Sequence, residues 1–257
     1  MRKEWREGKT EMTKLYQKSE ISFAILWIVA YVVLTSAADQ LSESVGVMKS
    51  VTAALHIVMS LILFFWIRNN DLGKKYGFCR SAVPAKRFLY YVPLIIIAST
   101  AFWGGVKLQY GFLETALYIV SMCCVGFLEE VIFRGLLFRA MEKDDLRTAI
   151  LVSALTFGMG HIVNLFNGSG RELTVVLIQI VFAVLVGLVL IWIFYHGKSL
   201  VPCIVFHSVN NALKVFAAEG SLSTRADMII NLVLIVVVLG GYSFYLVKMF
   251  PIHYSQK

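Results

Sequence analysis

Three ionisable residues stand inside an apolar stretch of the sequence. Glu129 and Glu130 follow the run at residues 117–128, and Arg134 comes four residues after Glu130. Residues four apart share one face of an α-helix, so Glu130 and Arg134 are predicted to form an ion pair. Glu129 is rotated by about 100° from Glu130 and has no partner on its own helix. A buried carboxylate without a partner tends to be protonated or to lie against water.

Two later motifs supply further polar side chains at helical spacing. Phe157 and His161 are four residues apart, with Gly158 and Gly160 between them. Small residues of this kind let a neighbouring helix approach closely. His207 and Asn211 are again four apart and project together. A single histidine in a membrane helix most often makes an interhelical hydrogen bond, but two histidines, an asparagine and the spare Glu129 are expected to face one polar interior.

The composition predicts that these residues lie in a membrane. The chain has 257 residues, of which 58% are hydrophobic and 16% charged, and its mean hydropathy is +0.74. Soluble domains carry about 25% charged residues, so an integral membrane protein is predicted. The net charge of +8 does not indicate nucleic-acid binding, because the basic residues flank apolar runs. The four cysteines have neither disulfide-framework nor zinc-knuckle spacing.

The elements that must position the polar residues are membrane helices. Eight segments are long enough to cross roughly 30 Å of hydrocarbon, which predicts an all-α polytopic bundle. Eighteen Lys and Arg residues fall on one side of eight crossings and three on the other. This bias predicts that both termini are cytoplasmic. We expect a cytoplasmic arm at 1–20, a transmembrane domain at 21–250 with the candidate residues within 114–217, and a cytoplasmic tail at 251–257. The predicted spans are 21–38, 46–67, 88–106, 114–138, 148–166, 173–195, 200–217 and 227–249.

The three motifs in this order resemble the signature of the CAAX protease and bacteriocin-processing family, also called Abi. Glu129-Glu130-x-x-x-Arg134 is followed by Phe157-x-x-x-His161 and then by His207-x-x-x-Asn211. Members of that family are polytopic intramembrane endopeptidases, and they include the type II CAAX prenyl endopeptidases. The resemblance covers residues 129–211, whereas the earlier spans match only as generic membrane helices.

The resemblance implies a role for each motif residue. Glu129 and His161 would activate water, and His207 and Asn211 would stabilise the oxyanion, with Glu130, Arg134 and Phe157 in support. A zinc ion held by Glu129, His161 and His207 is the alternative, although HExxH is absent. The expected substrate is a membrane-anchored or amphipathic peptide, such as a signal-peptide precursor or bacteriocin leader, in a bacterial cell membrane.

Two other functions fit the same polar interior. One is a non-catalytic membrane binding protein, either a scaffold or a bacteriocin-immunity protein. The other is a proton-coupled transporter, which also places Glu, Arg and His inside a bundle. Secondary carriers commonly have inverted repeats, and this sequence shows none. No feature of the sequence sets an oligomeric state.

Overall fold

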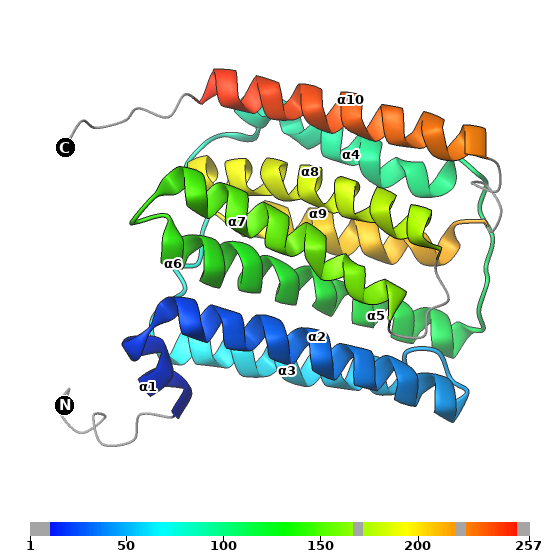
Figure 1. The fold of residues 1–257 in the computed structure, drawn as a ribbon, viewed down its shortest axis with the longest axis horizontal. Coiled ribbons are helices and arrows are strands. Elements are labelled where there is room, and N and C mark those ends of the chain that lie inside the picture. The colour runs from blue at the N-terminus through cyan, green and yellow to red at the C-terminus, as the bar shows by residue number, and fades with distance from the viewer. Residues whose placement is uncertain (1–10, 167–171, 219–224, 251–257) are drawn as a thin grey trace.

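The computed structural model describes residues 11–166, 172–218 and 225–250, with the backbone alone for 225–231 and 234. Residues 1–10 of the predicted arm, the loop at 167–171 and the predicted tail at 251–257 lie outside this description. The described residues form an all-α structure (Figure 1). Its elements are α1 (Glu11–Lys18), α2 (Glu20–Val45), α3 (Ser50–Asn69), η2 (Ala85–Tyr91), α4 (Val92–Ser99), η3 (Thr100–Phe102), α5 (Phe112–Glu129), η4 (Glu130–Phe138), α6 (Arg139–Met141), α7 (Leu146–Met159), η5 (Gly160–Leu165), α8 (Leu173–Gly197), α9 (Val201–Ala212), η6 (Leu213–Phe216) and α10 (Arg225–Met249).

Each of the eight predicted spans corresponds to a helical segment of the structure. Within the described residues, six helical stretches are long and apolar enough to cross a membrane. The segment formed by α9 and η6 is shorter, and the apolar helix recognised in α10 is limited to Ile235–Met249. The described residues therefore contain six candidate spans, and the count of eight crossings remains a prediction. The six are Glu20–Val45, Ser50–Asn69, Ala85–Phe102, Phe112–Met141, Leu146–Leu165 and Leu173–Gly197.

Local sequence signals explain where two of these spans begin and end. Ser19 caps the start of α2 by accepting a hydrogen bond from the backbone of Ser22, and α2 ends at Gly46 with φ of 75°. Glycine adopts this left-handed conformation without a Cβ penalty. Asp145 caps α7, because its carboxylate accepts hydrogen bonds from the backbones of Arg147 and Thr148.

The third span differs from the continuous helix that was predicted over 88–106. Leu89, Tyr90 and Tyr91 have positive φ, and a regular α-helix begins only at Val92. Pro93 follows at the start of that helix, where its missing N–H costs no hydrogen bond. The hydroxyl of Tyr242 in α10 donates to the carbonyl oxygen of Phe88 at 2.8 Å, which fixes the bend.

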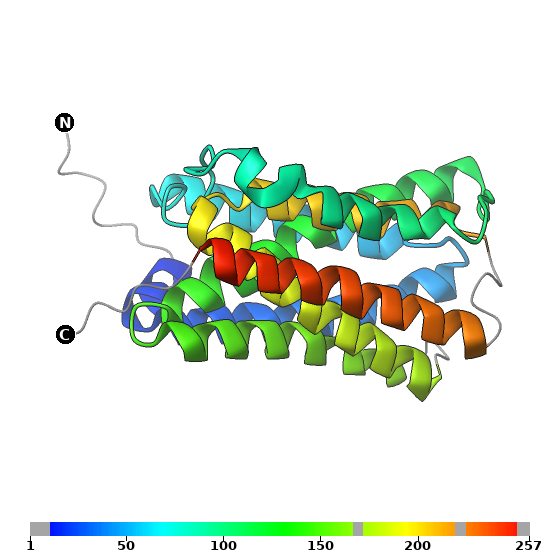
Figure 2. The ribbon, with the colours of Figure 1, turned by 90° about the horizontal axis from the view of Figure 1, so that it is seen from above.

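The helices run side by side, and α5 with its continuation η4 lies between two groups of neighbours (Figures 1 and 2). On one side are α2 and α3, and on the other are α7 and α9. The span Phe112–Met141 has the largest buried share of the six. Two glycines set the close approaches. A Cβ on Gly126 would lie 2.5 Å from the backbone nitrogen of Ser208 in α9, and one on Gly158 would lie 2.3 Å from a methyl of Val184 in α8.

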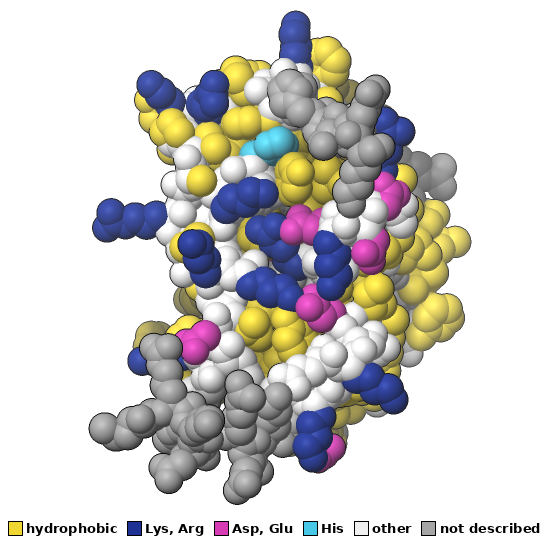
Figure 3. Space-filling model, turned by 90° about the vertical axis from the view of Figure 1, so that its left-hand side faces the viewer, with side chains coloured by type: hydrophobic (Ala, Val, Ile, Leu, Met, Phe, Trp, Pro, Cys, Tyr) yellow, Lys and Arg dark blue, Asp and Glu magenta, His cyan; other side chains and the backbone are white. Residues whose placement is uncertain are grey.

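One end of the bundle is rich in basic side chains (Figure 3). The start of α2 and the end of α10 both lie at this end (Figure 1). The short helix α1 is also fixed there, since Trp66 donates to Thr13 at 3.2 Å and Lys75 donates to Tyr16 at 2.6 Å. Lysine and arginine flanking membrane spans at one end are typical of the cytoplasmic side.

Candidate active site

The first motif begins at Glu129, the last residue of α5, and continues on η4, a π-helix that directly follows α5. The sequence predicted an α-helix through this region, and the structure has the wider turn instead. All nine residues of η4 are buried. The predicted ion pair is confirmed: Nη1 of Arg134 lies 3.1 Å from Oε1 of Glu130, and both side chains have no exposed surface. Single turns of π-helix occur frequently at functional sites.

His207 lies between the two glutamates, a relationship that the motif spacing did not reveal. Its Nδ1 is 2.8 Å from Oε1 of Glu130, and its Nε2 is 3.3 Å from Oε2 of Glu129. The close approach of α5 and α9 at Gly126 and Ser208 brings the imidazole to this position. The structure therefore joins Glu129, Glu130, Arg134 and His207 in one buried cluster.

The geometry of His207 constrains the protons of the cluster. A carboxylate only accepts hydrogen bonds, whereas a neutral imidazole has one donor and one acceptor nitrogen. An ionised Glu130 therefore accepts a hydrogen bond from Nδ1 of His207. Oε2 of Glu129 has no hydrogen-bond partner in the described residues, so its 3.3 Å approach to Nε2 is an ion pair only when the ring is protonated.

The ring of Phe157 connects the three motifs. The guanidinium carbon of Arg134 lies 4.0 Å from the centroid of this ring, which is a cation–π contact. The rings of His161 and His207 each lie 5.7 Å from it, edge to face. Gly187 in α8 leaves room for the guanidinium of Arg134, because a Cβ at this position would lie only 3.3 Å from Nη2. Phe157 thus ties α7 to η4 and α9.

The remaining two predicted residues, His161 and Asn211, have hydrogen-bond partners other than the two glutamates. His161 lies on the 3₁₀ turn η5, and its Nδ1 is 3.2 Å from the amide nitrogen of Gln179 in α8. The amide oxygen of Gln179 accepts from Asn164 at 3.1 Å. Because the amide nitrogen only donates, Nδ1 of His161 is the acceptor and its proton lies on Nε2. Asn211 lies one turn beyond His207, with its Oδ1 3.4 Å from Nδ2 of Asn210 and 3.5 Å from Nζ of Lys214.

Sequence reasoning missed two residues of this region. Gln179 stands in an otherwise apolar helix, and that isolation was the only available signal. Tyr31 in α2 donates to Oε1 of Glu129 at 2.7 Å, across 98 residues of sequence. Nothing in the local pattern around Tyr31 distinguishes it from a packing aromatic. Tyr31 therefore adds a contact to Glu129 from α2, a helix that lies before the segment carrying the three motifs.

The two glycines beside His161 behave differently from each other. Gly158 makes the predicted close approach to α8, whereas a Cβ on Gly160 would have no heavy atom within 4 Å. Only Gly158 is therefore required for helix packing.

The residues proposed for zinc do not form a recognisable metal centre. In the described parts of the chain, no group of three or more His, Cys, Asp or Glu side chains is arranged to hold a metal ion. His207 presents both ring nitrogens to carboxylates, and Nδ1 of His161 is turned to Gln179. The set Glu129, His161 and His207 does not fit a zinc ion in this arrangement, and we derive no step through one.

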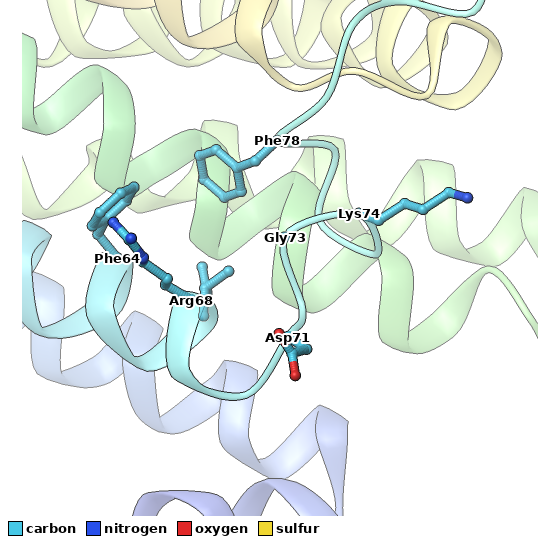
Figure 4. A pocket seen from close by; sticks show the side chains of 7 residues that line it. Phe64, Arg68, Asp71, Gly73, Lys74 and Phe78 are labelled. Carbon is cyan, nitrogen blue, oxygen red and sulfur yellow. The ribbon is translucent and has the colours of Figure 1, made fainter.

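A pocket of about 350 Å³ lies elsewhere, at the basic end of α3 (Figure 4). Phe64 and Arg68 of α3 and Phe78 of the following loop form part of its wall. In Figure 4 the side chain of Lys74 extends away from Phe78. None of the motif residues lines this pocket, so it is separate from the glutamate cluster.

Comparison with known families identifies the segment that carries the cluster. Residues 111–213 match the family model described as type II CAAX prenyl endopeptidase Rce1-like. The chain carries a domain of this family. Neither a curated protein nor a solved structure matches the chain. The family match confirms the resemblance inferred from the three motifs.

The CAAX endopeptidase domain runs from the start of α5 to the end of α9 and contains every motif residue. The match of this domain to an endopeptidase family indicates a protease that acts on a peptide substrate. Together with the six candidate spans, it identifies the chain as an integral, multi-pass membrane protein.

Proposed function

We propose that the chain is an intramembrane endopeptidase that hydrolyses a peptide bond in a membrane-anchored or amphipathic substrate. The observation that carries this proposal is the buried contact of Glu129 and Glu130 with His207, inside the segment that matches the endopeptidase family. Carboxylates and histidines this deep in an apolar bundle are costly and are commonly functional.

In the proposed reaction, Glu129 acts as the general base and His161 helps to position the water. Water attacks the peptide carbonyl carbon while Glu129 takes one of its protons, so that a tetrahedral oxyanion forms. His207 and Asn211 donate hydrogen bonds to that oxyanion. The carbon–nitrogen bond then breaks, and the proton held by Glu129 passes to the leaving amine.

The supporting residues prepare His207 for this role. Glu130 accepts a hydrogen bond from Nδ1, which favours a ring that also carries a proton on Nε2. That second proton is then available to a substrate oxygen. Arg134 balances the charge of Glu130, and Phe157 holds the guanidinium in place. A hydrogen-bond donor such as Nε2 of His207 stabilises an oxyanion most strongly in a site that excludes water.

We further propose eight crossings with both termini in the cytoplasm, and the division into an arm at 1–20, a membrane domain at 21–250 and a tail at 251–257. The basic end of the bundle is then cytoplasmic (Figure 3). Glu129 precedes Arg139 by ten residues, so the site would lie inside the membrane span on the side of its cytoplasmic end. Candidate substrates are signal-peptide precursors, bacteriocin leaders and other membrane-anchored peptides.

The test is cleavage of a panel of membrane peptides by the purified protein in nanodiscs. We compare wild type with Glu129→Gln and Glu130→Gln, and we use Glu114→Gln as the matched control. Glu114 is a partly buried glutamate at the start of the same helix, where it accepts from the backbone of Met48. Removing the general base should lower the rate by about 100-fold or more. The Glu114 variant should cleave as wild type does.

Several results would change the proposal. Full activity in Glu129→Gln would overturn its role as the base. Loss of cleavage with a chelator, restored by zinc, would move the mechanism to a metal held by the alternative set. A wild-type protein that cleaves no peptide across a broad panel would favour the binding or immunity function, and proton-coupled uptake in liposomes would favour transport.

A further inference from the structure

Tyr31 lies on the buried face of α2, outside the segment that matches the endopeptidase family. Buried residues of this helix recur three or four positions apart and include Phe23, Trp27 and Tyr31. The opposite face carries exposed valines at 29 and 33. Only 7% of Tyr31 is exposed, so its hydroxyl must find its hydrogen-bond partner inside the bundle.

That partner is the proposed general base. The hydroxyl of Tyr31 donates to Oε1 of Glu129 at 2.7 Å, while Nε2 of His207 lies 3.3 Å from Oε2. The carboxylate is thus held between α2 and α9, with one oxygen facing each helix. A short hydrogen bond to an ionised carboxylate is among the stronger ones in proteins.

A second polar cluster holds the ring of Tyr31 in place. The imidazole of His56 in α3 lies 5.9 Å from it, tilted by 31°. Both nitrogens of His56 are themselves held, by the hydroxyls of Thr35 and Ser121 at 3.0 Å each. Because His56 is buried and has hydrogen bonds on both sides, it limits the room in which the tyrosine ring can turn.

We propose that Tyr31 is a positioning residue for Glu129, an inference that rests on the proposed protease function. The hydroxyl donates a hydrogen bond to Oε1, and this bond fixes the plane of the carboxylate. Oε2, which faces His207, is then the oxygen that takes the proton from water. By this route α2 becomes part of the active site although it lies outside the family segment.

Kinetics of Tyr31→Phe test the role. The substitution keeps the ring and removes only the donor. We expect kcat to fall about tenfold to 100-fold, the equivalent of one hydrogen bond to a charged group, while KM changes little. The matched control is Tyr242→Phe, which removes an equally buried hydroxyl that donates to a backbone carbonyl far along the chain. It should lower the melting temperature without lowering kcat.

A double-mutant cycle tests the contact itself without any cleavage assay. Tyr31→Phe and Glu129→Met are combined, and the melting temperature in nanodiscs is measured for all four proteins. If the hydrogen bond exists, the two shifts are less than additive. Additive shifts would overturn the contact. Coupled shifts with an unchanged kcat in Tyr31→Phe would overturn the positioning role and leave the protease proposal standing. If wild type cleaves nothing, the proposed function fails and the positioning role fails with it, while the cycle still reports the contact.

Discussion

The imidazole of His207 and the carboxylate of Glu130 meet at 2.8 Å, although 77 residues separate them in sequence. This contact joins the first and last motifs of the endopeptidase domain. It depends on the packing of α5 against α9 and on the ion pair that holds Glu130 from its other side.

Replacing Arg134 should destabilise the protein strongly. Arg134→Gln leaves Glu130 buried without its cation, and breaking a buried pair in this way costs about 3 kcal/mol or more. Arg134→Lys keeps the charge but cannot stack on Phe157 in the same way, so its cost should be smaller. Thermal unfolding in detergent measures both. Equal stability of Arg134→Gln and wild type would show that the pair does not hold η4.

Gly126 should not tolerate a methyl group, whereas Gly135 in the same continuous helix should. A Cβ on Gly126 would collide with the backbone of Ser208, so α9 must move and carry His207 with it. A Cβ on Gly135 meets its nearest neighbour at 3.6 Å, which is ordinary contact. We expect Gly126→Ala to lower cleavage at least tenfold and Gly135→Ala to retain it. Similar activity in the two variants would contradict the close approach.

Phe157→Leu should lower activity more than its loss of stability explains. Leucine keeps the site apolar but removes the ring that contacts Arg134 and both histidines. Phe133→Leu is the comparison, because its ring packs against Phe157 at 5.3 Å and it is not one of the motif residues. The kcat of each variant relative to that of wild type, measured below the melting temperature, separates loss of activity from loss of stability. Equal losses in both variants would reduce Phe157 to a packing residue.

Gln179→Met should weaken catalysis by releasing His161. Methionine has nearly the same length but offers no amide donor to Nδ1, so the ring can turn and its proton can move between nitrogens. Asn164 loses its acceptor at the same time. We expect a lower kcat with little change in stability. Unchanged kcat would place His161 outside the reaction or show that its orientation is set by other contacts.

Lys75 should give the fold a contribution that disappears at alkaline pH. Burial opposes its charge, but hydrogen bonds with Glu20 and Tyr16 raise the pKa of Lys75 above its ordinary value. A raised folded pKa means that the stabilisation is fully present below about pH 10 and is lost as the pH rises through the folded pKa. The difference in melting temperature between wild type and Lys75→Met should therefore be constant up to about pH 10 and shrink only as the pH rises above the ordinary lysine pKa of about 10.4. A constant difference would contradict this origin.

The sequence was sufficient for the features that depend on one helix. The pair Glu130–Arg134 follows from i,i+4 spacing, and each predicted apolar segment corresponds to a helical region of the structure. Contacts between helices could not be predicted, because they depend on which faces meet. His207 reaches Glu130 through a close approach at Gly126, and Tyr31 reaches Glu129 from a helix whose pattern is that of any lipid-facing span. The π-helical turn of η4 has no signal in the amino-acid pattern.

The complete burial of η4 restricts how this protein can evolve. Surface loops accommodate extra residues readily, but an insertion or deletion between residues 130 and 138 would rotate every later side chain of the segment relative to Glu129. No residue of η4 faces outward to absorb the change. Among homologous sequences, insertions and deletions should therefore occur in the connecting loops. The stretch from Glu129 to Phe138 should align without gaps even where its residues differ.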